Sequence, residues 1–130
     1  MRPSEEKKKN AAKLAYRWCC ENLKKSKYHT NYPRIIIISK KIGKLRGYYK
    51  EKKNLIVIYT KNHRSILDIC RTIIHEWKHY QQDVMKMYDT YIVKYGRNFK
   101  NHPYEITAEN FAIKHSSECK KWILSISKNK

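Results

Sequence analysis

Apolar residues recur three or four positions apart in the first part of the chain, as they do on one face of an α-helix: Ala11, Leu14, Ala15, Trp18 and Leu23. Ser4 precedes this stretch and is followed by Glu5 and Glu6, an arrangement typical of a helix N-terminus. The pattern predicts a first helix that begins after Ser4 and ends near Lys25.

The middle of the chain carries short apolar runs that are typical of strands. Arg34–Ser39 contains four consecutive isoleucines, and Asn54–Thr60 reads Asn-Leu-Ile-Val-Ile-Tyr-Thr. Both compositions favour strands. Gly47–Lys52 follows a turn-prone stretch and is expected to form a strand between them. These segments predict a small three-stranded sheet, for which we expect antiparallel pairing.

Two further helices are expected after the sheet. Ser65 followed by Asp68 resembles a capping box, and a helical apolar stripe then continues to the next polar region: Ile66, Ile69, Cys70, Ile73, Trp77, Tyr80 and Val84. Pro103 suits the first position of a last helix, whose apolar face includes Ile106 and Phe111. The predicted order is helix, three strands, helix, helix, in one α+β domain covering residues 1–130.

A His-Glu-x-x-His pattern lies inside the second predicted helix, as His75-Glu76-Trp77-Lys78-His79. Because residues four apart share one face of a helix, His75 and His79 can both present a ring nitrogen to one metal ion, with Glu76 beside them. The alternative is an ordinary helix whose histidines bind no metal. The pattern favours a zinc site.

Two histidines alone do not hold zinc tightly, so a third ligand is needed. Asp83 follows His75 by eight residues, about 12 Å along a straight helix, which is too far for both to reach one ion. The last predicted helix offers Glu105 and Glu109 one turn apart. We assign Glu105 as the third ligand and Glu109 as the hydrogen-bond acceptor that orients a ligating histidine. Three alternatives stay open: an exchange of these two roles, His102 as the ligand, and a Glu109 that faces solvent without a role.

The motif set resembles the gluzincin-type zincins, especially the compact ImmA/IrrE-like and phage-encoded minimal metallopeptidases. The resemblance rests on His75–His79 and on the Glu-x-x-Ala-x-x-Phe-Ala run at Glu105–Ala112, and it covers approximately Asn54–His115. It implies a minimal zincin fold whose edge strand, Leu55–Thr60, lies beside the metal helix and can pair with an extended peptide. The chain departs from the ImmA/IrrE-like pattern in having Glu109 where Asn is usual and in having no appended recognition domain.

The activity that this resemblance implies is zinc-dependent hydrolysis of peptide bonds. Three protein ligands leave a fourth zinc position for water, and Glu76 is expected to act as the general base and later to pass the proton to the leaving amine. His102, Tyr104 and Tyr95 are candidates for stabilising the oxyanion. A looser likeness to SprT-type, DNA-associated proteases concerns the basic charge, because the third-ligand segment here carries Glu instead of a His-Gly motif.

The excess of basic over acidic residues indicates which partners the chain could bind. Thirty Lys and Arg against 11 Asp and Glu give a formal net charge of +19, which attracts polyanions. The basic residues are spread along the sequence, however, and AT-rich coding also enriches Lys, Ile, Asn and Tyr. We expect a protein or peptide substrate, with nucleic-acid-associated proteins as one class of it. Non-specific nucleic-acid or nucleoprotein contact stays open.

The spacing of the cysteines and the length of the apolar runs indicate the cellular compartment. No CxxC spacing occurs among Cys19, Cys20, Cys70 and Cys119, which favours reduced thiols over a zinc knuckle. The chain also shows no signal-peptide pattern and no run long enough to span a membrane. We therefore expect a cytoplasmic protein with no membrane partner, found in the host cytoplasm or the virion if it is viral.

A function from a different class competes with the peptidase. The chain would then be a non-enzymatic, basic structural component of a virion or another nucleoprotein particle that keeps the zincin fold. Glu76 separates the two hypotheses, because a purely structural zinc site does not need this acid whereas a peptidase does. The intact Glu76 favours the enzyme.

Overall fold

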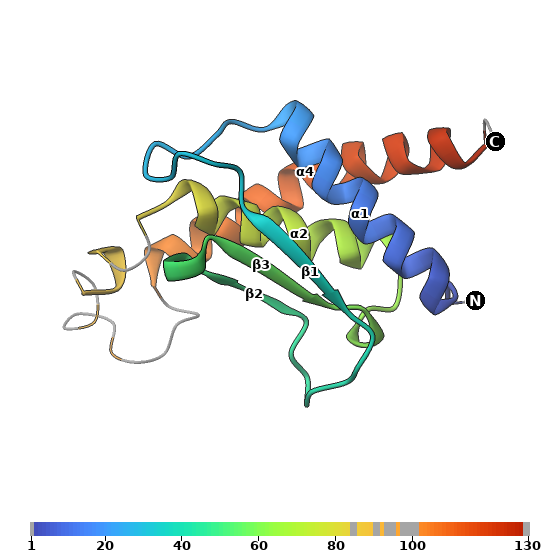
Figure 1. Cartoon of the computed structure of the whole chain (residues 1–130), viewed down its shortest axis with the longest axis horizontal. Coiled ribbons are helices and arrows are strands. Elements are labelled where there is room, and N and C mark those ends of the chain that lie inside the picture. The colour runs from blue at the N-terminus through green and yellow to red at the C-terminus, as the bar shows by residue number, and fades with distance from the viewer. Residues whose placement is uncertain (1, 84–85, 90–91, 93–95, 97–101, 129–130) are drawn as a thin grey trace.

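The computed structural model describes residues 2–83, 86–89, 92, 96 and 102–128, and it has the expected α+β class (Figure 1). Helices and strands follow in the expected order: α1 (Glu5–Asn22), β1 (Arg34–Ile38), β2 (Gly47–Lys50), β3 (Leu55–Tyr59), α2 (Ile66–Gln81) and α4 (Pro103–Lys128). Short 3-10 turns at Glu51–Lys53 and Thr60–Asn62 flank β3. Within the described residues, no helix combines the length and apolar character needed to cross a membrane.

The helices begin where the capping signals predicted and end earlier than expected. The Ser4 hydroxyl accepts a hydrogen bond from the backbone N–H of Lys7 at 3.2 Å, and Ser65 accepts one from Asp68 at 3.1 Å. These bonds satisfy donors that a helix start leaves without partners. The helix α1 ends at Asn22 instead of near Lys25. The helix α2 ends at Gln81, with Gln82 in an extended conformation, so it does not continue to the predicted Val84, which itself lies outside the described residues.

The sheet is mixed, which corrects the expected antiparallel pairing. Its order is β1-β3-β2, with β1 parallel and β2 antiparallel to β3. The strand expected at the edge, Leu55–Thr60, is therefore central, and the edge strands are β1 and β2. Burial explains the order, because all five residues of β3 are buried while exposed positions occur in both other strands. The most apolar strand buries the most hydrophobic surface when a neighbouring strand lies on each side of it, so the central position stabilises the fold most.

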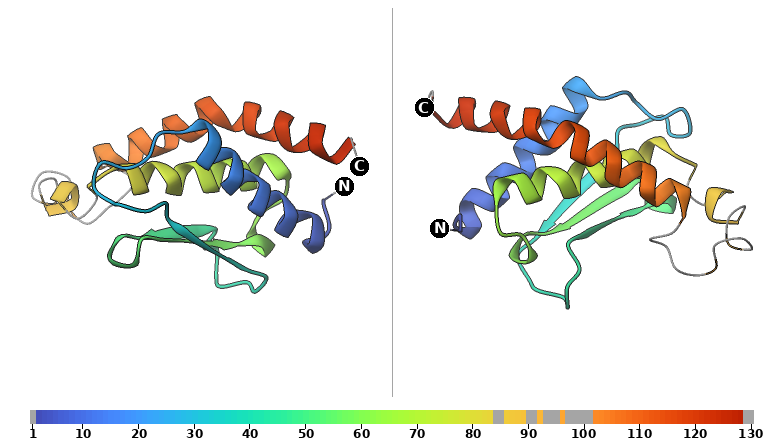
Figure 2. Two further views of the ribbon diagram at one scale, coloured as in Figure 1. Left: turned by 45° about the horizontal axis from the view of Figure 1, so that its top comes forward. Right: turned by 180° about the vertical axis from the view of Figure 1, so that it is seen from behind.

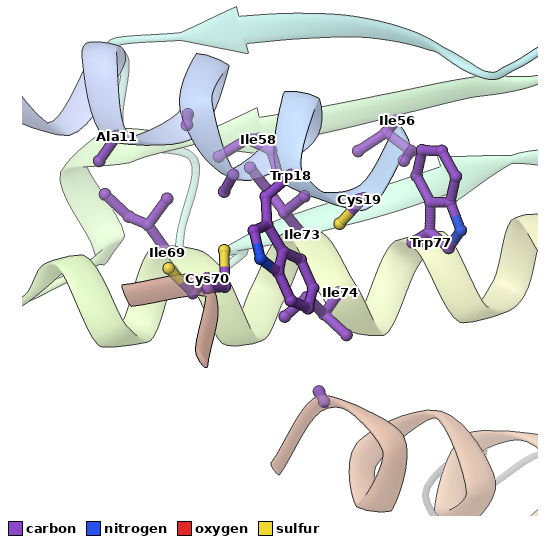
Figure 3. Close-up of a cluster of buried hydrophobic side chains, with 14 of the residues drawn as sticks. Ala11, Trp18, Cys19, Ile56, Ile58, Ile69, Cys70, Ile73, Ile74 and Trp77 are labelled. Carbon is purple, nitrogen blue, oxygen red and sulfur yellow. The ribbon is translucent and has the colours of Figure 1, made fainter. Parts of the chain in front are cut away.

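The helix α2 lies between the sheet and α4, and α1 crosses beside it (Figure 2). Its stripe of Ile69, Ile73 and Trp77 packs against Ile56 and Ile58 of β3, against α1, and against Ala112 and Cys119 of α4 (Figure 3). Burying these side chains stabilises the fold by about 1.5–3 kcal/mol for each large apolar group. The packing fixes the orientation of α2, and therefore the direction in which its polar face points.

All four cysteines are free thiols, as their spacing predicted: Cys19, Cys20, Cys70 and Cys119. Cys19 and Cys70 lie inside the apolar core (Figure 3). Burial raises the pKa of Cys19, because a thiolate loses its hydration there. These thiols fill the core as small apolar side chains do.

Candidate metal centre

Two histidines on the polar face of α2 point towards the start of α4. Because the apolar stripe of α2 faces the core, the positions between its members point to the side where α4 and β2 lie. His75 and His79 are one turn apart there, and their Nε2 atoms are 3.2 Å from each other. His79 is buried, and the side chain of His75 keeps 17% of its surface exposed.

The first turn of α4 adds a carboxylate to the two imidazoles. Pro103 opens this helix, and Glu105 follows two residues later. The Glu105 carboxylate contacts Nε2 of His79 through one oxygen, and its other oxygen lies 3.5 Å from Nε2 of His75. The two nitrogens and a Glu105 oxygen all lie within 4.8 Å of one another. The structure thus brings together the His75, His79 and Glu105 that the sequence analysis assigned as zinc ligands.

The donor set and its spacing fit a zinc ion. Zinc prefers imidazole nitrogen, thiolate and carboxylate oxygen, and bonds of about 2.0–2.1 Å place tetrahedral ligand atoms about 3.3 Å apart. The separations of 3.2 Å between the histidine nitrogens and 3.5 Å between His75 and Glu105 lie close to this value. His79 and Glu105 lie closer together than this value and would have to move apart to admit the ion.

Each histidine has a hydrogen-bond partner at its other ring nitrogen. Nδ1 of His75 lies 3.1 Å from a carboxylate oxygen of Glu109, which can only accept, so Nδ1 carries the proton and donates it. Nδ1 of His79 lies 2.9 Å from Oε1 of Gln82, whose Nε2 donates to the backbone carbonyl of Tyr104 at 3.2 Å. With Nδ1 protonated, Nε2 of each ring is free to act as a metal ligand.

Gln82 is the supporting residue that the sequence reasoning missed. A glutamine side chain has no strong preference between cleft and surface, so its type alone gives no signal. Its position was the signal, because Gln82 follows His79 by three residues and therefore lies on the same side of the helix. Gln82 is buried and links the end of α2 to the start of α4.

When no metal ion is bound, charge pairing determines the protonation of His75, His79 and Glu105. Burial by itself lowers the pKa of His75, but a hydrogen bond to Glu105 and the charges of Glu76, Glu105 and Glu109 raise it to about 9. The pKa of His79 is also raised, mainly by Glu105 against the effect of burial. Although burial alone raises the pKa of Glu105, hydrogen bonds from the two histidines lower it to about 2. The carboxylate is therefore ionised at neutral pH.

Glu76 lies beside the two histidines with only 7% of its surface exposed. Burial raises the pKa of its carboxyl group, whereas the neighbouring histidines and a hydrogen bond from the backbone N–H of Tyr49 act in the opposite direction. A groove of about 580 Å³ runs past this acid, between β2 and the first turn of α4. A carboxylate of raised pKa next to a metal-binding geometry is suited to accept and return a proton.

The close approach of β2 to this site depends on Gly47. A Cβ atom at this position would lie 2.7 Å from the backbone oxygen of Val57 and 3.0 Å from Cγ2 of Thr72 on α2. Real Cβ atoms do not approach a backbone oxygen so closely, so a larger residue would push β2 away from β3 and from α2. The absence of a side chain lets the edge strand form one wall of the groove.

The residues considered for the oxyanion and for alternative ligation lie in different places. His102 is fully buried, and its Nε2 lies 2.7 Å from the backbone oxygen of Gly96. It does not belong to the metal group found among the described residues. Tyr104 lines the groove, with its ring centroid 5.9 Å from that of His79. Tyr95 falls outside the described residues.

Comparisons with known proteins found no matching family model and no significant similarity to a curated protein or a solved structure. The case for a metal centre therefore depends on the geometry of His75, His79 and Glu105, with Glu76 beside them.

Proposed function

We propose that this chain is a zinc metallopeptidase of the minimal zincin type, with His75, His79 and Glu105 as zinc ligands and Glu76 as the general base. The observation that supports it best is the convergence of the three donor atoms, drawn from α2 and α4, within 4.8 Å of one another. A buried Glu76 and a groove of about 580 Å³ adjoin them. Peptide hydrolysis requires this combination, whereas a structural zinc site needs only the ligands.

Zinc and the surrounding residues have separate roles in the proposed reaction. Bound zinc supplies Lewis acidity, which polarises a carbonyl group and makes water a stronger acid. The Glu76 carboxylate accepts the proton of the attacking water and passes it to the leaving amine. Burial favours this role, because it raises the pKa of Glu76 and so makes its carboxylate a stronger base. Glu109 and Gln82 hold the imidazole rings in the required tautomer and orientation.

The strand expected to hold the substrate is β2, and not Leu55–Thr60 as the resemblance implied. The backbone N–H of Tyr59 donates to the oxygen of Arg46 at 2.9 Å. Since bonded pairs alternate along an antiparallel ladder, Gly47 and Tyr49 direct their backbone groups away from β3, towards the free edge. The Tyr49 N–H already donates to Glu76, so an extended peptide can pair with the backbone groups of Gly47 and the carbonyl of Tyr49 while its scissile bond passes Glu76.

The decisive experiment compares the zinc-loaded wild type with Glu76→Gln on a proteome-derived peptide mixture, using mass spectrometry of the products. Gln has the size of Glu but accepts no proton at neutral pH, so the variant should retain zinc and fold while hydrolysis is lost. Metal analysis of His75→Ala and His79→Ala should show loss of zinc, and Glu105→Ala should weaken its binding. Equal products from wild type and Glu76→Gln would overturn the peptidase proposal.

The net charge of +19 favours a second candidate function, that of a basic structural component in a virion or another nucleoprotein particle. Under this proposal zinc holds α2 and α4 together, and Glu76→Gln alters neither assembly nor any reaction. The peptide assay described above separates the two functions. A peptidase that acts on nucleic-acid-associated proteins would combine the charge with the activity.

A further inference from the structure

A second hollow, with strongly positive walls, lies next to the candidate site. It has a volume of about 370 Å³, and we call it the basic pocket, defined by its cationic lining residues Arg2, Lys41, Lys44, Arg46, Lys61 and Arg64. The only other lining residues are Gly43 and Asn62, so none of the described residues that line it is acidic. Cations gathered around a hollow focus its positive potential.

Hydrogen bonds hold the loop that forms this pocket in place. The side-chain amide of Asn62 donates to the backbone oxygens of Leu45, at 2.6 Å, and Gly43, at 3.3 Å. The backbone N–H of Leu45 donates to the oxygen of Ile42 at 3.1 Å, and Gly43 has a φ angle of 54°, a value that favours glycine. Lys41, Lys44 and Arg46 therefore sit on a loop of defined shape, which lowers the entropy cost of binding a ligand.

Acidic residues neutralise only part of this positive charge: the charge of Lys61 helps to lower the pKa of Glu5, and Arg46 lies near Asp68. Among the salt bridges found in the described part of the structure, Arg46 is the only member of the basic pocket that takes part, with Asp68 at 4.0 Å. Like charges held together raise the energy of the folded chain unless an anion binds between them. The basic pocket is therefore built to receive a negatively charged group.

The basic pocket shares one lining residue, Arg46, with a hollow at the candidate metal site. That hollow has a volume of about 200 Å³ and is also lined by Gly47, His75 and Glu76. The strand β2 begins at Gly47, directly after Arg46. A peptide paired with the free edge of β2 would extend from the metal site past the start of this strand, towards the basic pocket.

We propose that the basic pocket recognises acidic side chains of the peptide substrate, a few residues from the cleaved bond. This proposal rests on the proposed peptidase function and adds the class of substrate to it. Asp or Glu side chains would reach the cations on the side where the peptide passes the start of β2. The preference would direct a strongly basic enzyme to acidic segments of its substrates.

The surroundings of the basic pocket favour a polypeptide ligand over a nucleic acid. Ile42 and Leu45 are 52% and 40% exposed on the same loop, beside Lys41, Lys44 and Arg46. Aliphatic side chains complement the apolar groups of a peptide, whereas single-stranded nucleic acids bind where bases stack on aromatic rings. No aromatic residue is among those found to line the pocket in the described structure.

The first test measures cleavage-site preferences in a proteome-derived peptide mixture. Acidic residues should be enriched on one side of the cleaved bond in the wild type, by about tenfold if one charged hydrogen bond is gained. Lys44→Gln combined with Lys61→Gln should abolish the enrichment. Lys13→Gln combined with Lys121→Gln, which removes the same charge from exposed positions on α1 and α4, should retain it. Equal enrichment in both double variants, or none in the wild type, would overturn the proposal.

A binding assay separates failure of this proposal from failure of the peptidase proposal. Zinc-loaded Glu76→Gln is titrated into a labelled glutamate-containing peptide and its glutamine counterpart, and fluorescence anisotropy is recorded. Tighter binding of the glutamate peptide, lost with Lys44→Gln and Lys61→Gln, supports acidic recognition even if no peptide is cleaved. If those substitutions release a labelled single-stranded DNA while both peptides bind equally, the pocket serves nucleic acid and the proposal is wrong.

Discussion

At the scale of single residues, each histidine of the cluster has one ring nitrogen directed at the other donors and one at a supporting side chain. Nδ1 of His75 bonds Glu109, and Nδ1 of His79 bonds Gln82. The first partner was predicted and the second was not. An acidic residue one turn from an assigned ligand is easily recognised, whereas a glutamine is recognised only when the end of its helix is known.

Gln82 provides a sharp test of this arrangement. Gln82→Ala should lower zinc affinity by roughly 10- to 100-fold, the usual effect of removing a residue that orients a ligand. The affinity is measured by competition with a chelator. Gln81→Ala is the matched control, because Gln81 donates to the backbone oxygen of Lys24 and has no bond to a histidine. A similar loss in both variants would show that Gln82 does not act through His79.

The protonation of His75 sets the pH dependence of metal binding. The surrounding carboxylates raise its pKa from 6.5 to about 9 against the opposing effect of burial. Zinc must displace this proton, so the zinc affinity should increase as the pH rises towards about 9. Chelator competition across this range measures the effect. An affinity that stays constant between pH 6.5 and 9 would contradict the raised pKa of His75.

The same pKa predicts an opposite trend for the stability of the metal-free chain. Since the folded-state pKa of His75 lies above its unfolded value, the ion pairing with Glu105 and Glu109 contributes fully below about pH 6.5. This contribution is lost as the pH rises through about 9. Urea denaturation with and without zinc distinguishes the two trends.

At the scale of elements, the contact between β2 and α2 shapes the groove. Gly47→Ala should destabilise the fold by about 1–3 kcal/mol, because the new Cβ would overlap the backbone oxygen of Val57 and crowd Thr72. Urea denaturation measures the loss. Lys50→Ala, at an exposed position of the same strand, should change stability little. Equal stability of wild type and Gly47→Ala would mean that β2 moves away without cost.

The helices were more predictable from the sequence than the sheet. Ser4, Ser65 and Pro103 are local signals, and each stands where the structure begins a helix. The order of the strands depends on which strand is buried on both faces, and two apolar runs of similar length, Arg34–Ser39 and Asn54–Thr60, do not reveal this. The antiparallel expectation failed because β1 pairs in parallel with β3. The edge strand beside the groove was misplaced for the same reason.

The candidate site was more predictable than the groove around it. The donor set can be recognised from the sequence alone. It follows from the spacing of His75 and His79 and from the two acidic residues of the last helix. The position of β2 and the burial of Glu76 depend on packing between segments that are distant in the sequence. The basic pocket could not be predicted, because its cations come from separate parts of the chain and Asn62 fixes the loop that gathers them.

At the scale of the whole molecule, a net charge of +19 predicts contact with nucleic acids through the phosphate backbone. Binding to a labelled duplex should show little sequence preference and should weaken steeply with salt, because it is driven by counterion release. Removing Lys44 and Lys61 should reduce the affinity no more than removing Lys13 and Lys121. Titrations at two salt concentrations measure this. No binding at low salt would contradict the prediction.

The position of Glu105 in the first turn of α4 has a consequence for folding. A metal ion held between His79 and Glu105 would be a cross-link that closes the whole connection between α2 and α4 into a loop. Closing a loop removes conformations from the unfolded chain, as a disulfide does, and the free energy of metal binding adds directly to folding. The availability of zinc in the surroundings would then set how much of the chain is folded, independently of any catalysis.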